Sequence, residues 1–245
     1  MQLKKPKLIL GSALVILILV VTIVERNLPT VKYGIRKINI VLFQAGEVAG
    51  GTITQVPAKF HRQEHTLSCE IASLKMALSV YGFDIAESEL ISKLNFDPTP
   101  RTKTTWGNPF TGFVGNIDGK MIQDGYGVYW DPIADVAKLY THAEDTQFDP
   151  IKLATEINQG HPVVSWGYAG AGKRVSWIAP SGSRIDAVNG EHARTITGFT
   201  GSVTNPTGFI ILDPIYGKLY WKTADLMHNW EPFGNMGVVV YPKSI

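Results

Sequence analysis

The stretch Cys69–Tyr81, CEIASLKMALSVY, carries the clearest amphipathic helix signal in the chain. Its apolar residues recur at helical spacing and share one face: Ile71, Leu74, Ala77 or Leu78, and Tyr81. Ser68 stands at the N-cap position, and Gly82 follows as a stop signal. We therefore expect a helix that buries this face against the rest of the fold.

Segments after this helix change from helical to strand-like patterns. Shorter helices are predicted at 86–94, 132–140 and 150–158, and strands at 162–166, 192–199, 208–212, 218–221 and 237–241. Helices that precede a run of strands favour an α+β domain, with N-terminal helices packed on an antiparallel sheet. The segment Gly167–Lys173, GYAGAGK, imitates a phosphate-binding loop, but Arg174 stands where Ser or Thr is required. We expect a flexible loop there.

The N-terminal part reads as a membrane anchor rather than as part of that domain. Residues 8–24 are uncharged and almost all aliphatic, which is long enough for one transmembrane helix. A cleavable signal peptide would show a shorter apolar run and a small-residue site after it, and a buried core helix would have a polar face. We predict a tail at 1–7, the anchor at 8–24, a stalk at 25–50 and one folded domain at 51–245. The domain is expected outside the cytoplasm on a single-pass protein of the cell membrane.

Composition excludes several classes of protein. Lys and Arg number 23 against 21 Asp and Glu, without a dense basic stripe, so a nucleic-acid partner is not expected. A single Cys excludes a disulfide-stapled scaffold. The sequence predicts neither a cofactor nor a metal ion.

Cys69 is the candidate nucleophile because it lies in the first turn of the best helix. Free backbone N–H groups and the helix dipole favour an anion at this position and would lower a thiol pKa. The alternative is a buried structural cysteine.

His192 and Asp213 are the candidate base and orienting residue. A hairpin centred near Ser202 and Val203 would oppose them directly, and a slip of two positions would still leave a diagonal contact. The alternative is a surface His and a turn Asp before Pro214. Together with Cys69, the pair makes a set of nucleophile, base and orienting carboxylate.

Eight segments, in order, resemble the C39-like branch of papain-fold cysteine peptidases. They are Gln63-x5-Cys69, 68–82, 106–110, 113–115, 125–129, 160–166, 191–198 and 211–214. The resemblance implies a papain-like cysteine peptidase fold that hydrolyses peptides or proteins through a thioacyl intermediate. It implies Cys69 as nucleophile, His192 as base, Asp213 as orienting residue, and Gln63 completing an oxyanion hole with the Cys69 backbone N–H. Gln55 is an alternative to Gln63 at a worse spacing.

One departure from the family pattern limits what is carried over. Bacteriocin-processing relatives have Cys-Gly and sit on a transporter, whereas this chain has Cys69-Glu70 and no transporter or nucleotide-binding domain. Cleavage after a double-glycine leader is therefore not implied. The pattern instead suggests a membrane-anchored bacterial branch.

Two other functions compete with a cysteine peptidase. One is a catalytically idle peptide-binding or scaffold domain of the same fold. The other is a zinc hydrolase, because His61-Arg-Gln-Glu64-His65 matches an inverted zinc-peptidase signature, which needs both His on one helix face. The flanking sequence has no helical period, which favours a polar loop.

The long stretch 95–127 is rich in glycine and contains several aromatic residues. Loops of this length are often functional, so we predict a wall of the substrate cleft. Trp106, Phe113 and Trp166 are the candidate substrate contacts. The alternative is an Ω-loop packed on its own aromatic side chains.

Overall fold

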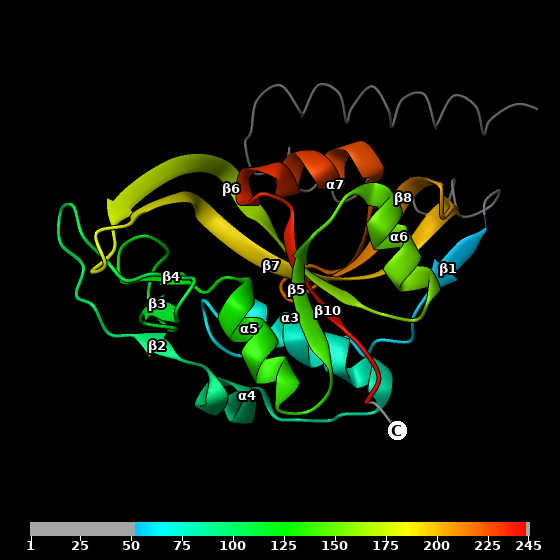
Figure 1. The fold of residues 1–245 in the computed structure, drawn as a ribbon, viewed down its shortest axis with the longest axis horizontal. Coiled ribbons are helices and arrows are strands. Elements are labelled where there is room, and N and C mark those ends of the chain that lie inside the picture. The colour runs from blue at the N-terminus through cyan, green and yellow to red at the C-terminus, as the bar shows by residue number, and fades with distance from the viewer. Residues whose placement is uncertain (1–51, 244–245) are drawn as a thin grey trace, which may run out of the picture. The chain divides into compact units, whose positions relative to one another are not determined.

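The computed structural model describes residues 52–243 (Figure 1). Its main element is a seven-stranded antiparallel sheet in the order β5-β10-β6-β7-β8-β9, with β1 paired to β7 beyond the end of β6. The strands are β1 (Ile53–Gln55), β5 (Ala143–Gln147), β6 (Val163–Ile178), β7 (Arg184–Ser202), β8 (Asn205–Asp213), β9 (Gly217–Lys222) and β10 (Met236–Val240). The predicted α+β class with an antiparallel sheet is confirmed.

Helices cover both faces of this sheet (Figure 1). They are α3 (Cys69–Leu78), α4 (Glu87–Lys93), α5 (Trp130–Lys138), α6 (Pro150–Asn158) and α7 (Thr223–Trp230), with short 3-10 turns at Ser79–Tyr81 and Glu231–Phe233. A second, three-stranded sheet consists of β2 (Phe96–Asp97), β3 (Phe113–Gly115) and β4 (Gly125–Gly127).

Successive side chains of the central strands alternate between the two faces of the sheet, so the core consists of two clusters, one on each face. Val164 of β6 packs in the cluster that contains α3 and α5 side chains, whereas its neighbour Val163 packs in the cluster of α6 and α7. In β10, Val238 and Val239 divide in the same way. Successive side chains in a strand point to opposite faces, so apolar runs are buried on both sides.

The helix at the centre of the sequence argument forms as predicted. It begins at Cys69, passes into a 3-10 turn after Leu78, and stops at Gly82, whose φ of +83° is the left-handed conformation that glycine favours. Ser68 occupies the N-cap position, but its side chain makes no capping hydrogen bond to the helix; its hydroxyl donates to the His65 carbonyl. The helices at 86–94, 132–140 and 150–158 are also confirmed, the last with the predicted bounds.

Two expectations about the later part of the chain are wrong. The segment Gly167–Lys173 continues β6 through a register shift between Tyr168 and Lys173, because pairing with β7 extends well past the predicted end of the strand. Helix α7 lies between β9 and β10, so the helices do not all precede the strands. The stretch 95–127, by contrast, is mostly irregular as expected of a loop, although it also contains the short strands of the small sheet.

The predicted tail, anchor and stalk, residues 1–50, lie outside the described residues. Within 52–243, no helix combines the length and apolar character needed to cross a membrane.

Candidate active site

Cys69 opens α3, and its side chain is 5% exposed. Its thiol donates a hydrogen bond to Glu70 Oε2, at 3.2 Å from Sγ. Burial, followed by the nearby carboxyls of Glu70 and Glu191, raises the thiol pKa well above its usual value, while hydrogen bonding from the Ala193 backbone opposes the rise. The expected lowering of this pKa is therefore wrong, because desolvation and two acidic neighbours outweigh the helix terminus.

The β7–β8 hairpin brings His192 and Asp213 together. Its register pairs Thr195 with Leu212, and the turn lies between Ser202 and Asn205, so His192 and Asp213 are offset by two positions from direct opposition. They meet diagonally, with His192 Nε2 at 3.1 Å from both Asp213 carboxylate oxygens. The predicted contact is confirmed, although its register differs from direct pairing.

Asp213 is fully buried and held as a carboxylate. Oδ1 accepts hydrogen bonds from the backbone N–H groups of Ile215 and Tyr216, and Oδ2 accepts one from Arg194 Nε at 2.9 Å. Burial would raise the Asp213 pKa, but the hydrogen bond from His192 and the charge of the Arg194 guanidinium hold it well below the usual range.

Burial favours the neutral form of His192. Burial, followed by the charge of Arg194, lowers its pKa, with Asp213 acting in the opposite direction. Because the ionised Asp213 can only accept, Nε2 of His192 carries the hydrogen, which leaves Nδ1 as the basic nitrogen. A neutral imidazole oriented by a carboxylate is the arrangement that a general base requires.

Arg194 is a site residue that the sequence argument missed. Its guanidinium lies 4.8 Å from the Trp221 ring centroid and donates to Asn229 Oδ1 at 3.3 Å, besides its bond to Asp213. It lies two positions after His192, on the same face of β7. That spacing was the signal that could have identified it.

Gln63 lies in the segment before α3 and is tied to the residue after Asp213, because its backbone N–H donates to the Pro214 carbonyl at 3.2 Å. Its side-chain Nε2 donates to the carbonyls of His65 and Thr66 at 2.8 and 2.9 Å. Its Oε1 is buried, and no hydrogen-bond partner is found for it in the described part of the chain. Both amide hydrogens are thus already engaged.

The alternative residue, Gln55, lies elsewhere. It pairs with Gly198 near the C-terminal end of β7, and its Oε1 accepts from Lys218 Nζ at 3.0 Å. This position on the sheet favours Gln63 over Gln55 as the residue near Cys69.

The structure does not join Cys69 to His192 directly. Among residues 52–243, no hydrogen bond links the two side chains; the thiol instead faces Glu70, Glu191 and the Ala193 backbone. Ala193 directly follows His192, so the thiol lies beside the base but is turned toward the carboxyls.

Glu70 and Glu191 form a buried acidic pair next to Cys69. Glu70 Oε1 accepts from the Val128 backbone N–H at 2.7 Å. Burial raises the Glu70 pKa to about 7, and burial together with the Glu70 charge raises that of Glu191. Glu70 departs from the family pattern in sequence, whereas the position of Glu191 beside it follows only from the fold.

Residues 61–65, which match the zinc-peptidase signature in sequence, do not form the helix that this motif requires. Residues 61–65 are not helical, and His61 pairs with the buried Glu87 at 2.6 Å, whereas His65 pairs with Asp118 at 2.8 Å. The two histidines therefore serve different partners, which contradicts the helical zinc motif and agrees with the polar loop.

All three predicted substrate contacts belong to the core. Phe113 and Trp166 are each 1% exposed and Trp106 is 2% exposed, and all three pack in the cluster that contains α3 and α5 side chains. Trp166 also donates from Nε1 to the Val128 carbonyl at 2.9 Å. Their burial leaves almost no surface for a substrate, so the structure contradicts this prediction for all three residues.

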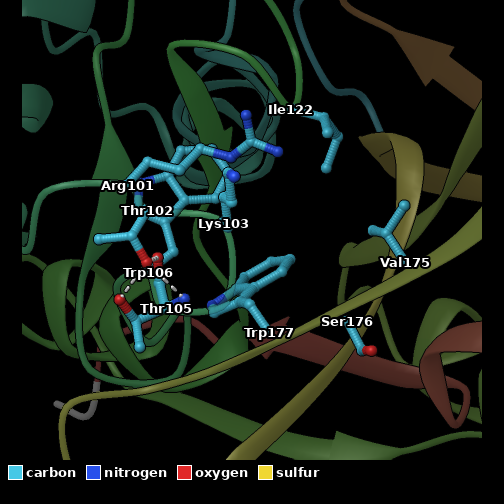
Figure 2. Close-up of a pocket in the computed structure, with 9 residues that line it drawn as sticks. All are labelled: Arg101, Thr102, Lys103, Thr105, Trp106, Ile122, Val175, Ser176 and Trp177. Carbon is cyan, nitrogen blue, oxygen red and sulfur yellow. Dashed lines mark hydrogen bonds between the residues drawn. The ribbon is translucent and has the colours of Figure 1, made fainter.

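Trp106 lines a pocket of about 240 Å³ (Figure 2). Trp177 and Trp106 contribute its aromatic side, with ring centroids 5.4 Å apart, and Arg101 lies over Trp106 at 5.1 Å. Lys103 also lines this pocket. The positive charges of Arg101 and Lys103 suit an anionic group of a ligand.

The structure is thus an α+β domain in which a helix that begins with cysteine packs against a sheet that presents a His–Asp pair. The Peptidase_C39 like family model matches residues 53–238, and the chain belongs to this family.

Two similar proteins are a curated relative and a solved structure. The uncharacterized protein YvpB of Bacillus subtilis (strain 168) is 25% identical over 180 residues, which cover 70% of this chain and 68% of YvpB. The crystal structure of a candidate C39-like peptidase from Bacillus anthracis is 24% identical and superposes with a TM-score of 0.66, covering 80% of this chain and 100% of that one. The second likeness concerns the fold.

Proposed function

We propose that this chain is a cysteine peptidase that hydrolyses peptide or protein substrates through a thioacyl intermediate on Cys69. The observation that carries the proposal is the contact of His192 Nε2 with both Asp213 oxygens at 3.1 Å, next to the helix that begins with Cys69. Membership of the family supports the same reaction.

In the proposed mechanism, the Cys69 side chain turns from Glu70 toward His192, and Nδ1 takes the thiol proton. The thiolate attacks the substrate carbonyl, and the resulting oxyanion accepts hydrogen bonds from the Cys69 backbone N–H and from Gln63. His192 then returns its proton to the leaving amine. Water, deprotonated by the same nitrogen, hydrolyses the thioester and regenerates the thiol.

The test uses an electrophilic thiol probe and peptide cleavage with the same preparations. Wild type is expected to be labelled at Cys69 and to cleave peptides, Cys69→Ala to lose both, and His192→Ala to lose about 10² to 10⁴ in turnover. His142→Ala is the matched control, because this exposed histidine pairs with Glu144 away from Cys69. Full cleavage by Cys69→Ala, abolished by a chelator, would overturn the proposal.

A second candidate is a catalytically idle peptide-binding domain of the same fold. The observation that favours it is the resting contact of the Cys69 thiol with Glu70 instead of His192. Peptide binding by the wild type without cleavage or probe labelling would support this function over the peptidase.

We also propose that residues 8–24 anchor the chain in the cell membrane as a single span, with the peptidase domain outside the cytoplasm. The uncharged aliphatic run supports this, since a spanning helix satisfies its own backbone hydrogen bonds. The full chain is expected to stay in the membrane fraction after alkaline carbonate washing. Release by carbonate, or a mature N-terminus beyond Val24, would contradict the anchor.

A further inference from the structure

We propose that Cys69, Glu70 and Glu191 form a binding site for a thiophilic divalent cation, best matched by Zn²⁺, and that the bound ion blocks the nucleophile. Only the blocking of turnover rests on the proposed function; the binding of the ion stands apart from it. All three side chains are buried.

The donor atoms have the separation that a tetrahedral zinc ion requires. One ligand atom from each of the three residues lies within 4.8 Å of the others, and Cys69 Sγ is 3.2 Å from Glu70 Oε2. Zinc bonds of about 2.3 Å to sulfur and about 2.0 to 2.2 Å to oxygen place tetrahedral donors roughly 3.5 Å apart. Small side-chain rotations therefore suffice to bring the donors to these distances.

Glu191 points independently to a missing ligand. It is 3% exposed, and within residues 52–243 neither of its carboxylate oxygens has a hydrogen-bond partner. Buried carboxylates in folded proteins are normally hydrogen-bonded, paired or bound to a metal. The charge of Arg194 lowers the pKa of Glu191, but Arg194 Nε donates its hydrogen bond to Asp213 instead.

The backbone beside the pair leaves room for both carboxyls. Gly127 of β4 has φ +138°, and a Cβ at this position would collide with Glu70 Oε1 and Glu191 Oε2. Only a residue without a side chain can therefore lie next to the pair.

The chemistry of the donors selects the metal. One thiolate with two carboxylates suits Zn²⁺, whereas Ca²⁺ and Mg²⁺ prefer sites made only of oxygen. Binding forms a zinc–sulfur bond and releases the thiol proton to solvent. The sulfur lone pair is then engaged, so Cys69 cannot attack a carbonyl, and a fourth position stays open for water.

A second group of potential ligands, His61, Glu64 and Glu87, provides the comparison. Glu87 is already satisfied there, since His61 Nε2 lies 2.6 Å away and the Glu64 backbone N–H also donates to it. No buried oxygen of these three residues lacks a hydrogen-bond partner, so this group gives no indication of a bound cation. Glu64→Gln is therefore the matched control for a carboxylate lost away from Cys69.

The binding test titrates the full detergent-solubilised chain with Co²⁺ and follows thiolate-to-cobalt charge transfer. Wild type is expected to develop this band and to lose it on addition of Zn²⁺. Cys69→Ala should show no band, Glu191→Gln should bind at least tenfold more weakly, and Glu64→Gln should match the wild type. Absence of the band in wild type, or unchanged affinity in a folded Glu191→Gln, would overturn the site.

A measurement on the wild type alone avoids any variant that fails to fold. Saturating Zn²⁺ is expected to protect Cys69 from alkylation, and a chelator to restore the original rate. Alkylation that is equally fast with and without Zn²⁺ overturns the proposal. Both readouts are independent of peptide cleavage, so an inactive chain would contradict the peptidase and leave the ion site standing.

Discussion

The thiol of Cys69 lies 3.2 Å from the carboxyl of Glu70, the residue that follows it. In the proposed reaction this carboxyl competes with His192 for the thiol proton, because a hydrogen bond to Glu70 holds the sulfur in its protonated form. We therefore expect Glu70 to slow the reaction of Cys69.

Glu70→Gln is expected to make Cys69 more reactive toward a small alkylating reagent. The Glu70 charge is the second cause, after burial, of the raised thiol pKa, and glutamine removes that charge while preserving side-chain size. The midpoint of the alkylation rate against pH should move to lower pH, with a several-fold faster rate at neutral pH. Glu89→Gln is the control, since Glu89 accepts from Tyr140 on the surface. An unchanged midpoint in Glu70→Gln would contradict this role.

The same carboxyl predicts a pH dependence of stability. A carboxyl with a raised pKa binds more protons in the folded state than in the unfolded state, so its contribution is complete below the unfolded value. For Glu70 that contribution is lost as pH rises from about 4.5 through about 7. The free energy of unfolding should fall over this window, and less so in Glu70→Gln.

Asp213 acts with the opposite sign and in a different window. Its pKa is depressed, so its contribution is present above the usual value near 4 and is lost as pH falls further. Urea unfolding at several pH values separates the two effects. A slope between pH 4.5 and 7 that is equal in wild type and Glu70→Gln would contradict the buried state of Glu70.

Local patterns were enough to predict much of the sheet and three parts of the site. Helical spacing located α3 with Cys69 at its start, and a hairpin argument brought His192 to Asp213 even though the turn is centred one residue later than expected. Each of these predictions depends only on residues close in sequence or on a single turn, so it does not require knowledge of how distant segments pack.

Contacts between distant segments were beyond the reach of the same reasoning. Glu191 meets Glu70 only because α3 packs on β7, and the burial that raises the thiol pKa follows from that packing. An aromatic residue in a glycine-rich stretch is equally compatible with a cleft or a core, which is how Phe113 was misplaced. Sheet pairing across the register shift in β6 likewise overrode the glycines of 167–173.

Arg194→Ala is expected to destabilise the fold strongly. It removes one donor from the buried Asp213 carboxylate and the cation that lies over Trp221. Breaking a buried charged pair from one side typically costs about 3 to 5 kcal/mol in the free energy of unfolding. Arg194→Lys should recover only part of this loss, because an ammonium group cannot reproduce the directional bonds to Asp213 and Asn229.

Urea unfolding is the measurement, with Arg184→Ala as the control. Arg184 forms an exposed pair with Asp186, and such pairs contribute about 0 to 1 kcal/mol. Equal losses in Arg194→Ala and Arg184→Ala would show that the buried pair carries no special weight.

Gln63→Ala is expected to lower kcat by about 10² to 10³ while leaving alkylation of Cys69 unchanged. An oxyanion donor acts on charge that develops during acyl transfer, whereas thiol ionisation depends on the surroundings of Cys69 itself. The Gln63 amide donates to the carbonyls of His65 and Thr66 in this structure. One of these hydrogen bonds therefore has to break before the amide can donate to the oxyanion. Gln55→Ala should turn over normally, since Gln55 pairs with Lys218 on β9. Measuring kcat and the alkylation rate in both variants decides the assignment: normal turnover in Gln63→Ala would leave Gln63 as a loop residue that only links the α3 entry to Pro214.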